Sequence, residues 1–514
     1  MSLNLVTLLK EGAKAHSERP ALIVGDKILS YGMILDHTER FSAALAKLGV
    51  HRGQVIALLL PNVPHFSIAY FGAHARGCAV APLNVLLTAE EIAYYLDDSE
   101  AVAIVAWETL LPQALEAAKR VSTCKHVIVA KADATDASAP DGARSLNALI
   151  AGSEPDRVHA DTMPDDTAVI LYTSGTTGKA KGAELTQFNM FFNAVVCATV
   201  LFPAVGNQAT VSLGTLPLFH SFGQTVVHNM TLFQGGTVVL LPRFDPAAAL
   251  TAIQKHKVTF FAGVPTMYFS LLNHVDMSKY DVSSLCYCVS GGAPMPAEVM
   301  KAFDARYKVN ILEGYGLSET SPVASFNTID RPKKIGSIGR PIWGVDFKLA
   351  GDDGKVVTDN DKPGEICIRG HNVMKGYLKK PEATAEALKD GWFHTGDVAT
   401  RDEDGFYFIV DRKKDMILRG GFNVYPREIE EVLYGHPAVA EAAVIGVPHE
   451  SHGEEVKAIL ALKSGQSASA SDIVAYCKER LASFKYPRII EFMDALPKGP
   501  TGKILKRELR QKAR

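Results

Sequence analysis

Residues 167–182 read TAVILYTSGTTGKAKG, an apolar and β-branched run that stops at a turn rich in glycine and hydroxyl groups. A stretch with helical spacing follows from about Leu185. Strands buried on both faces have this composition, and alternation of strands with helices favours parallel sheets. The sequence therefore predicts an α/β fold, with a large region of layered parallel sheets and helices. Similar apolar runs that end at Gly, Pro or Asn lie at 55–62, 237–242, 258–265 and 285–294.

The length of the chain, 514 residues, indicates more than one domain. A single hydrophobic core stops growing near about 250–300 residues. The residues after DRKKDMI (411–417) have their own strand pattern near 438–448 and their own helix pattern near 470–484. We therefore expect a large N-terminal domain, residues 1–411, and a small C-terminal α+β domain, residues 412–514.

The composition excludes several classes of protein. With 47% hydrophobic and 21% charged residues, the chain differs from disordered proteins, collagens and long coiled coils. Its net charge of −2 lacks the basic surplus of nucleic-acid-binding proteins, although Lys and Arg outnumber Asp and Glu after Asp411. Seven cysteines without a C-x-x-C pair favour reduced core residues over disulfides or a thiolate zinc site.

The sequence contains no recognisable targeting or membrane-spanning segment. Its N-terminus lacks the basic start and the small-residue cleavage site of a secretory signal, and no apolar run reaches about 18 residues. We expect a cytoplasmic protein without a transmembrane helix, either a monomer or a homodimer. Peripheral contact with a membrane stays open.

The turn at residues 173–182 has the chemistry of a phosphate-binding loop. Its three glycines allow tight backbone conformations, and its four hydroxyl groups and two lysines can donate to phosphate oxygens. The spacing is not that of the G-x-x-x-x-G-K-[ST] loop. Its place between a strand and a helix favours a polyphosphate site over a flexible surface turn.

Four further motifs follow in order: GYGLSET (314–320), HTGD (394–397), DRKKDMI (411–417) and PKGPTGK (497–503). Together with the turn at 173–182 they resemble the adenylate-forming acyl-CoA synthetase superfamily, and most closely the bacterial medium- and long-chain fatty acid CoA ligases. Firefly luciferase and the adenylation domains of nonribosomal peptide synthetases are similar too. The resemblance implies that ATP and a carboxylic acid form an acyl adenylate, and that coenzyme A then displaces AMP. It also implies Mg²⁺ and a mobile C-terminal domain.

The resemblance implies three catalytic residues. The acid and ATP are both anions, so adenylate formation requires a cation between them. Lys503 in PTGK occupies that position in the superfamily, and the alternative is a solvated lysine in a basic tail. Glu319 is expected to bind Mg²⁺, for which one carboxylate beside ATP is sufficient. His220 resembles a gate residue beside the acyl site, although a lone histidine on an apolar strand is more often a core residue.

The nucleotide contacts follow from the same resemblance. Tyr315 is expected to stack on adenine, Ser318 to contact the α-phosphate, and Asp397 to accept hydrogen bonds from the ribose hydroxyls with help from Arg412. A core aromatic and a simple turn residue are the alternatives for Tyr315 and Asp397. The other residues expected to bind ATP or AMP are Thr173, Ser174, Gly175, Thr176, Thr177, Gly178, Lys179, Gly292, Ala293, Pro294 and Gly316.

Transfer to coenzyme A requires a second conformation, because Lys503 and an incoming thiol cannot occupy the same face of the adenylate. Lys414 stands at the position of the superfamily's hinge. After rotation about it, Gly420, Gly421 and Phe422 are expected to line the coenzyme A channel. The basic surplus of the C-terminal region suits the phosphates of coenzyme A, although a solvated basic face is an equally good interpretation of the charge alone.

The acyl pocket determines which acid is activated. Malonate-activating relatives carry an arginine where this chain has Gly314, so a dicarboxylic acid is not expected. The small Gly314 is expected to leave the end of the slot open. An uncharged tail is implied, and an alkyl chain is favoured over the aromatic ring of coumarate or benzoate ligases. The expected pocket residues are Phe219, Val264, Met267, Gly291, Gly314, Pro322 and Val323.

Other functions share these motifs. A nonribosomal peptide adenylation domain is not expected, because the sequence after Lys503 is too short for a carrier domain. An acyl-AMP ligase that loads a separate carrier protein stays open, and so does a luciferase-like oxygenase. A non-catalytic binding module is disfavoured because Lys503, Glu319 and Asp397 are all present.

Overall fold

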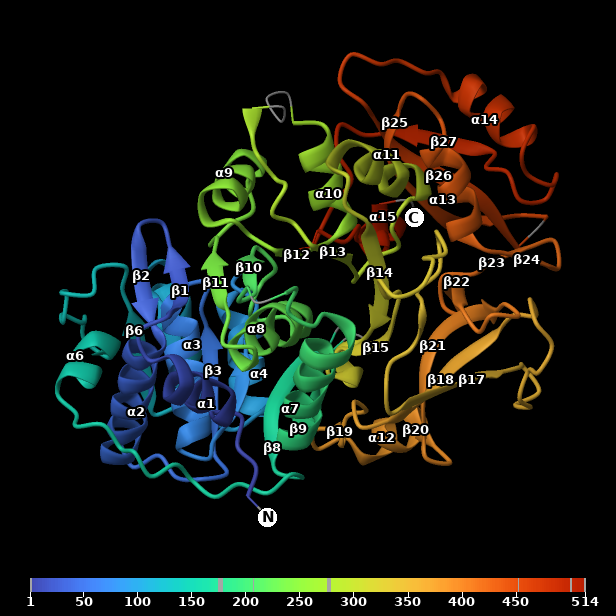
Figure 1. Ribbon diagram of the computed structural model, residues 1–514. Helices are drawn as coiled ribbons and strands as arrows, with labels where there is room; N and C mark the ends of the chain where they lie inside the picture. Colours follow the sequence, from blue (N-terminus) through green and yellow to red (C-terminus); the bar gives the residue numbers. More distant parts are fainter. Residues whose placement is uncertain are drawn as a thin grey trace.

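The computed structural model describes residues 2–173, 179–206, 208–274, 279–451, 453–499 and 502–512. It contains two large sheets flanked by helices, a smaller third sheet and a C-terminal lobe (Figure 1). This arrangement confirms the predicted α/β class.

The first sheet has eight strands in the order β19-β9-β8-β4-β3-β5-β6-β7. Its strands from β8 through β4, β3 and β5 to β6 are parallel, which is why their sequences are apolar on both faces. The strands are β3 (Val55–Leu59), β4 (Ala79–Pro82), β5 (Ala101–Trp107), β6 (His126–Ala130), β7 (Arg144–Ser145), β8 (Thr167–Thr173), β9 (Lys181–Thr186) and β19 (Gly376–Tyr377).

The second sheet has nine strands in the order β16-β15-β14-β13-β12-β10-β11-β1-β2. It is parallel from β14 to β1, and the strands at both ends run antiparallel. Its strands are β1 (Pro20–Val24), β2 (Lys27–Ser30), β10 (Val211–Gly214), β11 (Thr237–Leu240), β12 (Phe260–Gly263), β13 (Tyr287–Ser290), β14 (Ile311–Gly316), β15 (Val323–Phe326) and β16 (Arg340–Pro341).

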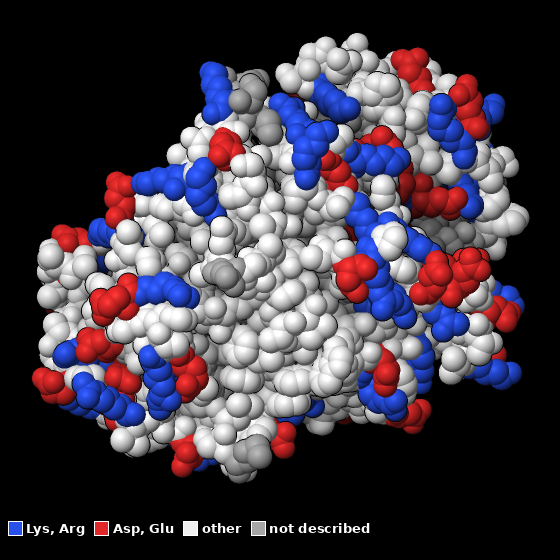
Figure 2. Space-filling view, in the orientation of Figure 1, with Lys and Arg blue, Asp and Glu red and all other residues white. Residues whose placement is uncertain are grey.

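The helices around these sheets share their core, because buried side chains of both sheets belong to one contiguous cluster. A segment of the chain from Gln187 to Pro242 contains no Asp, Glu, Lys or Arg. It includes α7 and α8, which lie in the middle of the view of Figure 1, where Figure 2 shows a broad uncharged surface. The helices are α1 (Thr7–His16), α2 (Tyr31–Lys47), α3 (Pro64–Ala75), α4 (Ala89–Asp98), α5 (Leu111–Lys119), α6 (Leu146–Ala151), α7 (Gln187–Val196), α8 (Met230–Phe233), α9 (Pro246–His256), α10 (Pro265–Leu272), α11 (Ala297–Tyr307) and α12 (Pro381–Ala387).

The segment after the glycine-rich turn differs from the prediction. The helical stretch expected from about Leu185 begins at Gln187, and the strand β9 precedes it. β9 pairs antiparallel with β8, so the turn joins two strands rather than a strand and a helix. Thr186 ends the strand by capping α7, where its hydroxyl accepts a hydrogen bond from the Asn189 amide at 3.1 Å.

The third sheet is antiparallel and leads into the C-terminal lobe. Its last strand ends at Arg412, and the first strand of the C-terminal sheet begins at Ile417. The lobe has hydrophobic clusters of its own, as an independent domain requires. The division after residue 411 stays a prediction. The strands are β17 (Val345–Ala350), β18 (Gly364–Gly370), β20 (Leu388–Lys389), β21 (Trp392–Arg401) and β22 (Tyr407–Arg412) in the third sheet, and β23 (Ile417–Arg419), β24 (Phe422–Val424), β25 (Val439–His449), β26 (Gly453–Leu462) and β27 (Ile489–Phe492) in the lobe.

The helices of the lobe are α13 (Pro426–Tyr434), α14 (Ala470–Lys478) and α15 (Lys506–Lys512). All seven cysteines are free, and six are buried as expected, whereas Cys286 is exposed. In the part of the chain that the structure describes, no helix has both the length and the apolar character needed to cross a membrane.

Candidate active site

A cavity of about 770 Å³ lies where both large sheets, the third sheet and the C-terminal lobe meet. A second cavity of about 410 Å³ adjoins it. Most of the residues predicted from the motifs line one cavity or both, although they come from distant parts of the sequence. Those in the first cavity are Thr173, His220, Val264, Gly291, Gly292, Gly314, Tyr315, Gly316, Ser318, Glu319, Pro322, Val323, Asp397, Arg412, Lys414 and Lys503, while Ala293 and Pro294 line the second.

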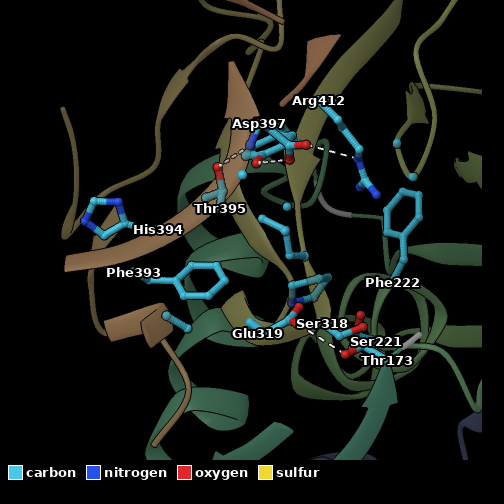
Figure 3. Close-up of a pocket in the computed structure, with 18 of the residues that line it drawn as sticks. Thr173, Ser221, Phe222, Ser318, Glu319, Phe393, His394, Thr395, Asp397 and Arg412 are labelled. Atoms are coloured by element: carbon cyan, nitrogen blue, oxygen red, sulfur yellow. Dashed lines mark hydrogen bonds and ion pairs between the residues drawn. The ribbon is translucent and has the colours of Figure 1, made fainter. Parts of the chain in front are cut away.

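Asp397 is the centre of the polar contacts on one wall (Figure 3). It lies on β21 directly opposite Arg412 on β22 and is only 4% exposed. One carboxylate oxygen accepts a hydrogen bond from the Tyr315 hydroxyl at 2.6 Å, and the other lies 3.0 Å from Arg412 Nε. The carboxylate holds the pKa of Arg412 above its usual range. Ionised carboxylates have about four lone-pair sites, so this one can also accept hydrogen bonds from a ligand.

Glu319 forms a second polar group on the opposite side of the cavity. It lies in the short helical turn Ser318–Thr320 that follows β14. One oxygen accepts hydrogen bonds from Thr173 Oγ1 at 3.3 Å and from the Tyr377 hydroxyl at 3.0 Å. Among the residues that the structure describes, no cationic side chain lies within 4 Å of this carboxylate. Glu319 thus presents a carboxylate to the cavity, and Arg412 is near enough for the two charges to interact.

Lys503 brings a positive charge into the cavity from the C-terminal lobe. Its turn is closed by hydrogen bonds between Gly499 and Lys503 and between Gly502 and Gly499, each 2.8 Å long. Gly502 has φ +76°, and a Cβ at this position would lie 2.6 Å from Thr266 Oγ1, so glycine is favoured where the lobe meets α10. Burial, reinforced by Arg412, lowers the pKa of Lys503 to about 8.

His220 lines the first cavity. Its Nδ1 accepts a hydrogen bond from the Phe222 amide at 3.2 Å. Burial and the neighbouring charge of Lys503 lower the pKa of His220 to about 4. The imidazole is therefore neutral at physiological pH, and Nε2 carries its proton because Nδ1 is an acceptor.

Glycines bring backbone close to backbone along the cavity wall. A Cβ at Gly316 would overlap the carbonyl oxygen of Pro322, and one at Gly291 would lie 3.2 Å from the ring of Phe222. Gly292 has φ +79°, a conformation that favours glycine. Larger residues at Gly316 or Gly291 would therefore push against Pro322 or Phe222, which line the same cavity.

Several predicted residues lie outside the lining of both cavities. Lys179 is exposed, and its ammonium group lies 5.7 Å from the centre of the Tyr94 ring. Phe219 packs against the main core, and Met267 is buried with its sulfur 3.9 Å from Thr215 Oγ1. The expected acyl slot is thus formed by fewer residues than the sequence suggested. Ser174, Gly175, Thr176, Thr177 and Gly178 lie outside the described residues.

The loop expected to line the coenzyme A channel also lies away from the cavities. Gly420 and Gly421 both have positive φ and open space beside their Cα atoms. Phe422 is 54% exposed and stacks on Phe484 at 4.6 Å. The structure therefore has Lys503, and not this loop, at the cavity.

The sequence analysis missed residues that only the fold brings to the site. Glu313 lines the second cavity, where its Oε1 accepts a hydrogen bond from the Met295 amide at 3.1 Å. Burial raises the pKa of Glu313 to about 7. Tyr377 supports Glu319 from β19, and Phe222 covers Gly291. Glu313 lies two residues before Tyr315 on the same strand. This spacing is the signal in the sequence that could have identified Glu313 as a site residue.

The space beside Gly314 is filled, which corrects the expectation of an open slot. Phe326 stands directly opposite Gly314 in the antiparallel pair of β14 and β15. A Cβ at Gly314 would overlap the Phe326 ring. Gly314 is therefore small because an aromatic side chain covers it, and this neighbour lies twelve residues further along the chain.

Comparison with known proteins gives matches along nearly the whole chain. Residues 9–378 match the model of the family described as AMP-binding enzyme, and residues 428–503 match that of the AMP-binding enzyme C-terminal domain. A long-chain-fatty-acid–CoA ligase of Bacillus subtilis (strain 168) is 38% identical, over 98% of this chain and 94% of the relative. A feruloyl-CoA synthase of an Amycolatopsis species is also 38% identical, over 97% of each chain.

Among solved structures, an anthranilate CoA ligase in complex with anthranoyl-AMP has a similar fold. The TM-score is 0.92 at 29% sequence identity, and the match covers 100% of this chain and 98% of the ligase. The likeness therefore extends over both the large N-terminal region and the C-terminal lobe.

Proposed function

The chain belongs to the AMP-binding enzyme family as an acid–thiol ligase, and we propose that it activates a medium- or long-chain fatty acid with ATP and transfers it to coenzyme A. One observation carries this proposal: Lys503 from the C-terminal lobe and the group of Asp397, Arg412 and Tyr315 line the same cavity. Such a cavity can hold a nucleotide and an acid with a cation between them.

The nucleotide is proposed to lie across the two cavities. Asp397 accepts hydrogen bonds from both ribose hydroxyls, with its charge balanced by Arg412. The adenine ring lies between Tyr315 and the main chain of Gly292, Ala293 and Pro294. This leaves the phosphates on the side of the first cavity that Thr173 and Ser318 line.

In the first step, a carboxylate oxygen of the acid forms a bond with the α-phosphorus while the bond to pyrophosphate breaks. Lys503 supplies the positive charge that reduces repulsion between the two anions and holds them in line. Ser318 donates to the α-phosphate. In the second step, the thiol sulfur of coenzyme A forms the thioester bond, AMP leaves, and the thiol proton passes to solvent.

Lys503 is expected to give the first step an alkaline limit. Burial lowers its pKa to about 8, so the required ammonium form is present below that pH and is lost above it. We expect kcat/KM for adenylate formation to fall as the pH rises through about 8. In Lys503→Arg, whose guanidinium stays charged, activity should be lower but without this alkaline fall. Pyrophosphate release at a series of pH values measures both profiles. If wild type and Lys503→Arg lost activity over the same alkaline pH range, Lys503 would not be the group that titrates.

Mg²⁺ fits the environment of Glu319. A carboxylate with hydroxyl neighbours and no cation within 4 Å among the described residues is a suitable single protein ligand for an ion otherwise bound by phosphate oxygens. The ion would neutralise phosphate charge when bound. Thr173 and Tyr377 orient the carboxylate toward that position.

Glu319→Gln is expected to raise the Mg²⁺ concentration for half-maximal adenylate formation by at least roughly 10- to 100-fold, which is the scale for losing a group that only orients a metal ligand. The amide keeps the shape of the side chain but removes its charge. Tyr377→Phe is the matched control, because it removes one hydrogen bond and keeps the carboxylate, so its shift should be smaller. Equal Mg²⁺ requirements in wild type and Glu319→Gln would exclude this role.

Transfer to coenzyme A is proposed to follow a rotation about Lys414. Lys503 lines the cavity, while Gly420, Gly421 and Phe422 lie outside it. A rotation that removes Lys503 from the cavity can bring this exposed loop to the adenylate. The resulting channel would admit the thiol.

The preference for a fatty acid rests on the apolar lining of the slot and on the relatives. Leu216, Phe222, Val264, Val323 and Phe326 line the cavity near His220. The match to the Bacillus ligase extends over nearly its whole length. A tail without charge is therefore the best fit.

An assay with a panel of acids tests this choice. Saturated fatty acids of increasing length, ferulic and benzoic acids, and malonate are each incubated with ATP, Mg²⁺ and coenzyme A, and thioester formation is measured. We expect the highest kcat/KM for a fatty acid and none for malonate. A preference for aryl acids would replace the fatty acid assignment, and turnover without coenzyme A but with a carrier protein would identify a carrier-loading ligase.

An aryl acid is the second candidate. The feruloyl-CoA synthase is as similar in sequence as the Bacillus ligase, and the anthranilate ligase has the same fold. Phe222 and Phe326, which cover the glycines of the slot, could also enclose a planar ring.

A further inference from the structure

Phe326 lines the first cavity next to Gly314, one of the residues of the proposed acyl slot. It lies on β15 opposite Gly314, and its ring fills the position where a side chain of residue 314 would stand. The ring lines the cavity but is only 5% exposed. A substrate chain that extends along the main chain of Gly314 therefore meets this ring.

The Phe326 ring is supported from behind by other aromatic side chains. It contacts Phe202 edge-on at 5.1 Å. Phe202 in turn contacts Phe260 at 5.2 Å and Tyr287 at 5.6 Å. Close-packed interiors do not yield to an extra methylene without strain, so the wall is rigid.

The opposite side of the slot is narrow as well. A Cβ at Gly291 would lie 3.2 Å from the Phe222 ring and 3.6 Å from the carbonyl oxygen of Gly314. The two glycines are thus neighbours, and each is covered by an aromatic ring.

We infer that Phe326 is the end wall of the acyl slot and sets the maximum length of the fatty acyl chain. This inference rests on the proposed function, since it concerns the tail of the acid that is activated. Acids whose terminal methyl group stops at the ring are accommodated, and longer acids must displace it.

Phe326→Ala tests the inference directly. We expect the kcat/KM of palmitate relative to octanoate to rise at least tenfold over the wild-type ratio, because each methylene that gains an apolar site contributes about fourfold. Phe326→Leu, which keeps the core better filled, should shift the ratio in the same direction by less. Thermal unfolding of both variants shows whether they are folded.

Phe303→Leu is the matched control, because Phe303 is fully buried in the same core and does not line either cavity. It should lower stability without changing the ratio. If both folded Phe326 variants kept the wild-type ratio, the end-wall role would be refuted. If wild type activated no fatty acid at all, the proposed function would fail instead, so the two failures are distinguishable.

Gly314→Ala gives an independent test. The new methyl group would overlap the Phe326 ring, so this variant should lose activity toward all chain lengths. In Gly314→Ala combined with Phe326→Ala the overlap is removed, and activity should recover at least tenfold relative to Gly314→Ala alone. Purely additive losses would show that the two residues do not share this space.

Discussion

Replacement of Lys503 by alanine is expected to slow acyl-adenylate formation roughly 10²-fold or more, the scale for one preorganised donor at a developing charge. Lys503 lines the cavity beside Arg412 and Asp397. Without its charge, the acid and the α-phosphate repel each other and lose their alignment. Acid-dependent pyrophosphate release measures the effect.

The two half-reactions separate a role in adenylation from general damage. Thioester formation from a supplied acyl adenylate should be far less affected in Lys503→Ala, because the proposed rotation removes Lys503 from the cavity before the thiol attacks. Lys498→Ala is a matched control from the same turn, where the lysine pairs with Glu441 at the surface. It should behave like wild type. Equal losses in both half-reactions would argue against the specific role.

Asp397→Asn is expected to raise the KM for ATP roughly 10²-fold. The amide lacks the negative charge that pairs with Arg412 and that strengthens the hydrogen bond from the Tyr315 hydroxyl. The proposed hydrogen bonds from the two ribose hydroxyls are weakened for the same reason. Hydrogen bonds to charged groups contribute about 1.5–3 kcal/mol each, so two weakened contacts give a factor of this size. Steady-state kinetics with saturating acid measure it.

Asp346→Asn controls for the loss of a carboxylate from the same sheet. Asp346 on β17 pairs with Arg369 at the surface, at 2.9 Å. Its replacement should leave the KM for ATP unchanged. If Asp397→Asn bound ATP as tightly as wild type, the ribose would have to be held elsewhere.

The sequence was sufficient to predict the fold class, because fully buried parallel strands are recognisable by composition alone. Strand β8 and the runs at β3, β11, β12 and β13 all lie where apolar segments end at turns. β9 was missed because its six residues, KGAELT, include charged and glycine positions that resemble a loop. Pairing with β8 makes it a strand, and pairing is not visible in local composition.

The residues of the candidate site could be predicted where each belongs to a sequence motif with a single expected role. Asp397 and Tyr315 are 82 residues apart, yet motif order was enough to expect them at one site, and their hydroxyl–carboxylate contact brings them together there. Their roles in binding a nucleotide stay a prediction. Phe326 could not be predicted, because its role depends on which residue faces Gly314 across an antiparallel pair. The register of that pair shifts between Tyr315 and Gly316, and local sequence patterns do not reveal such a shift.

Acid-dependent exchange of labelled pyrophosphate into ATP, without coenzyme A, tests most directly whether the cavity forms an acyl adenylate. Exchange requires that the first step be reversible and that the enzyme hold the mixed anhydride. With wild-type protein and a fatty acid we expect rapid exchange that depends on the acid and on Mg²⁺ and is lost in Lys503→Ala. Absence of acid-stimulated exchange with every monocarboxylic acid tested would contradict the proposed chemistry.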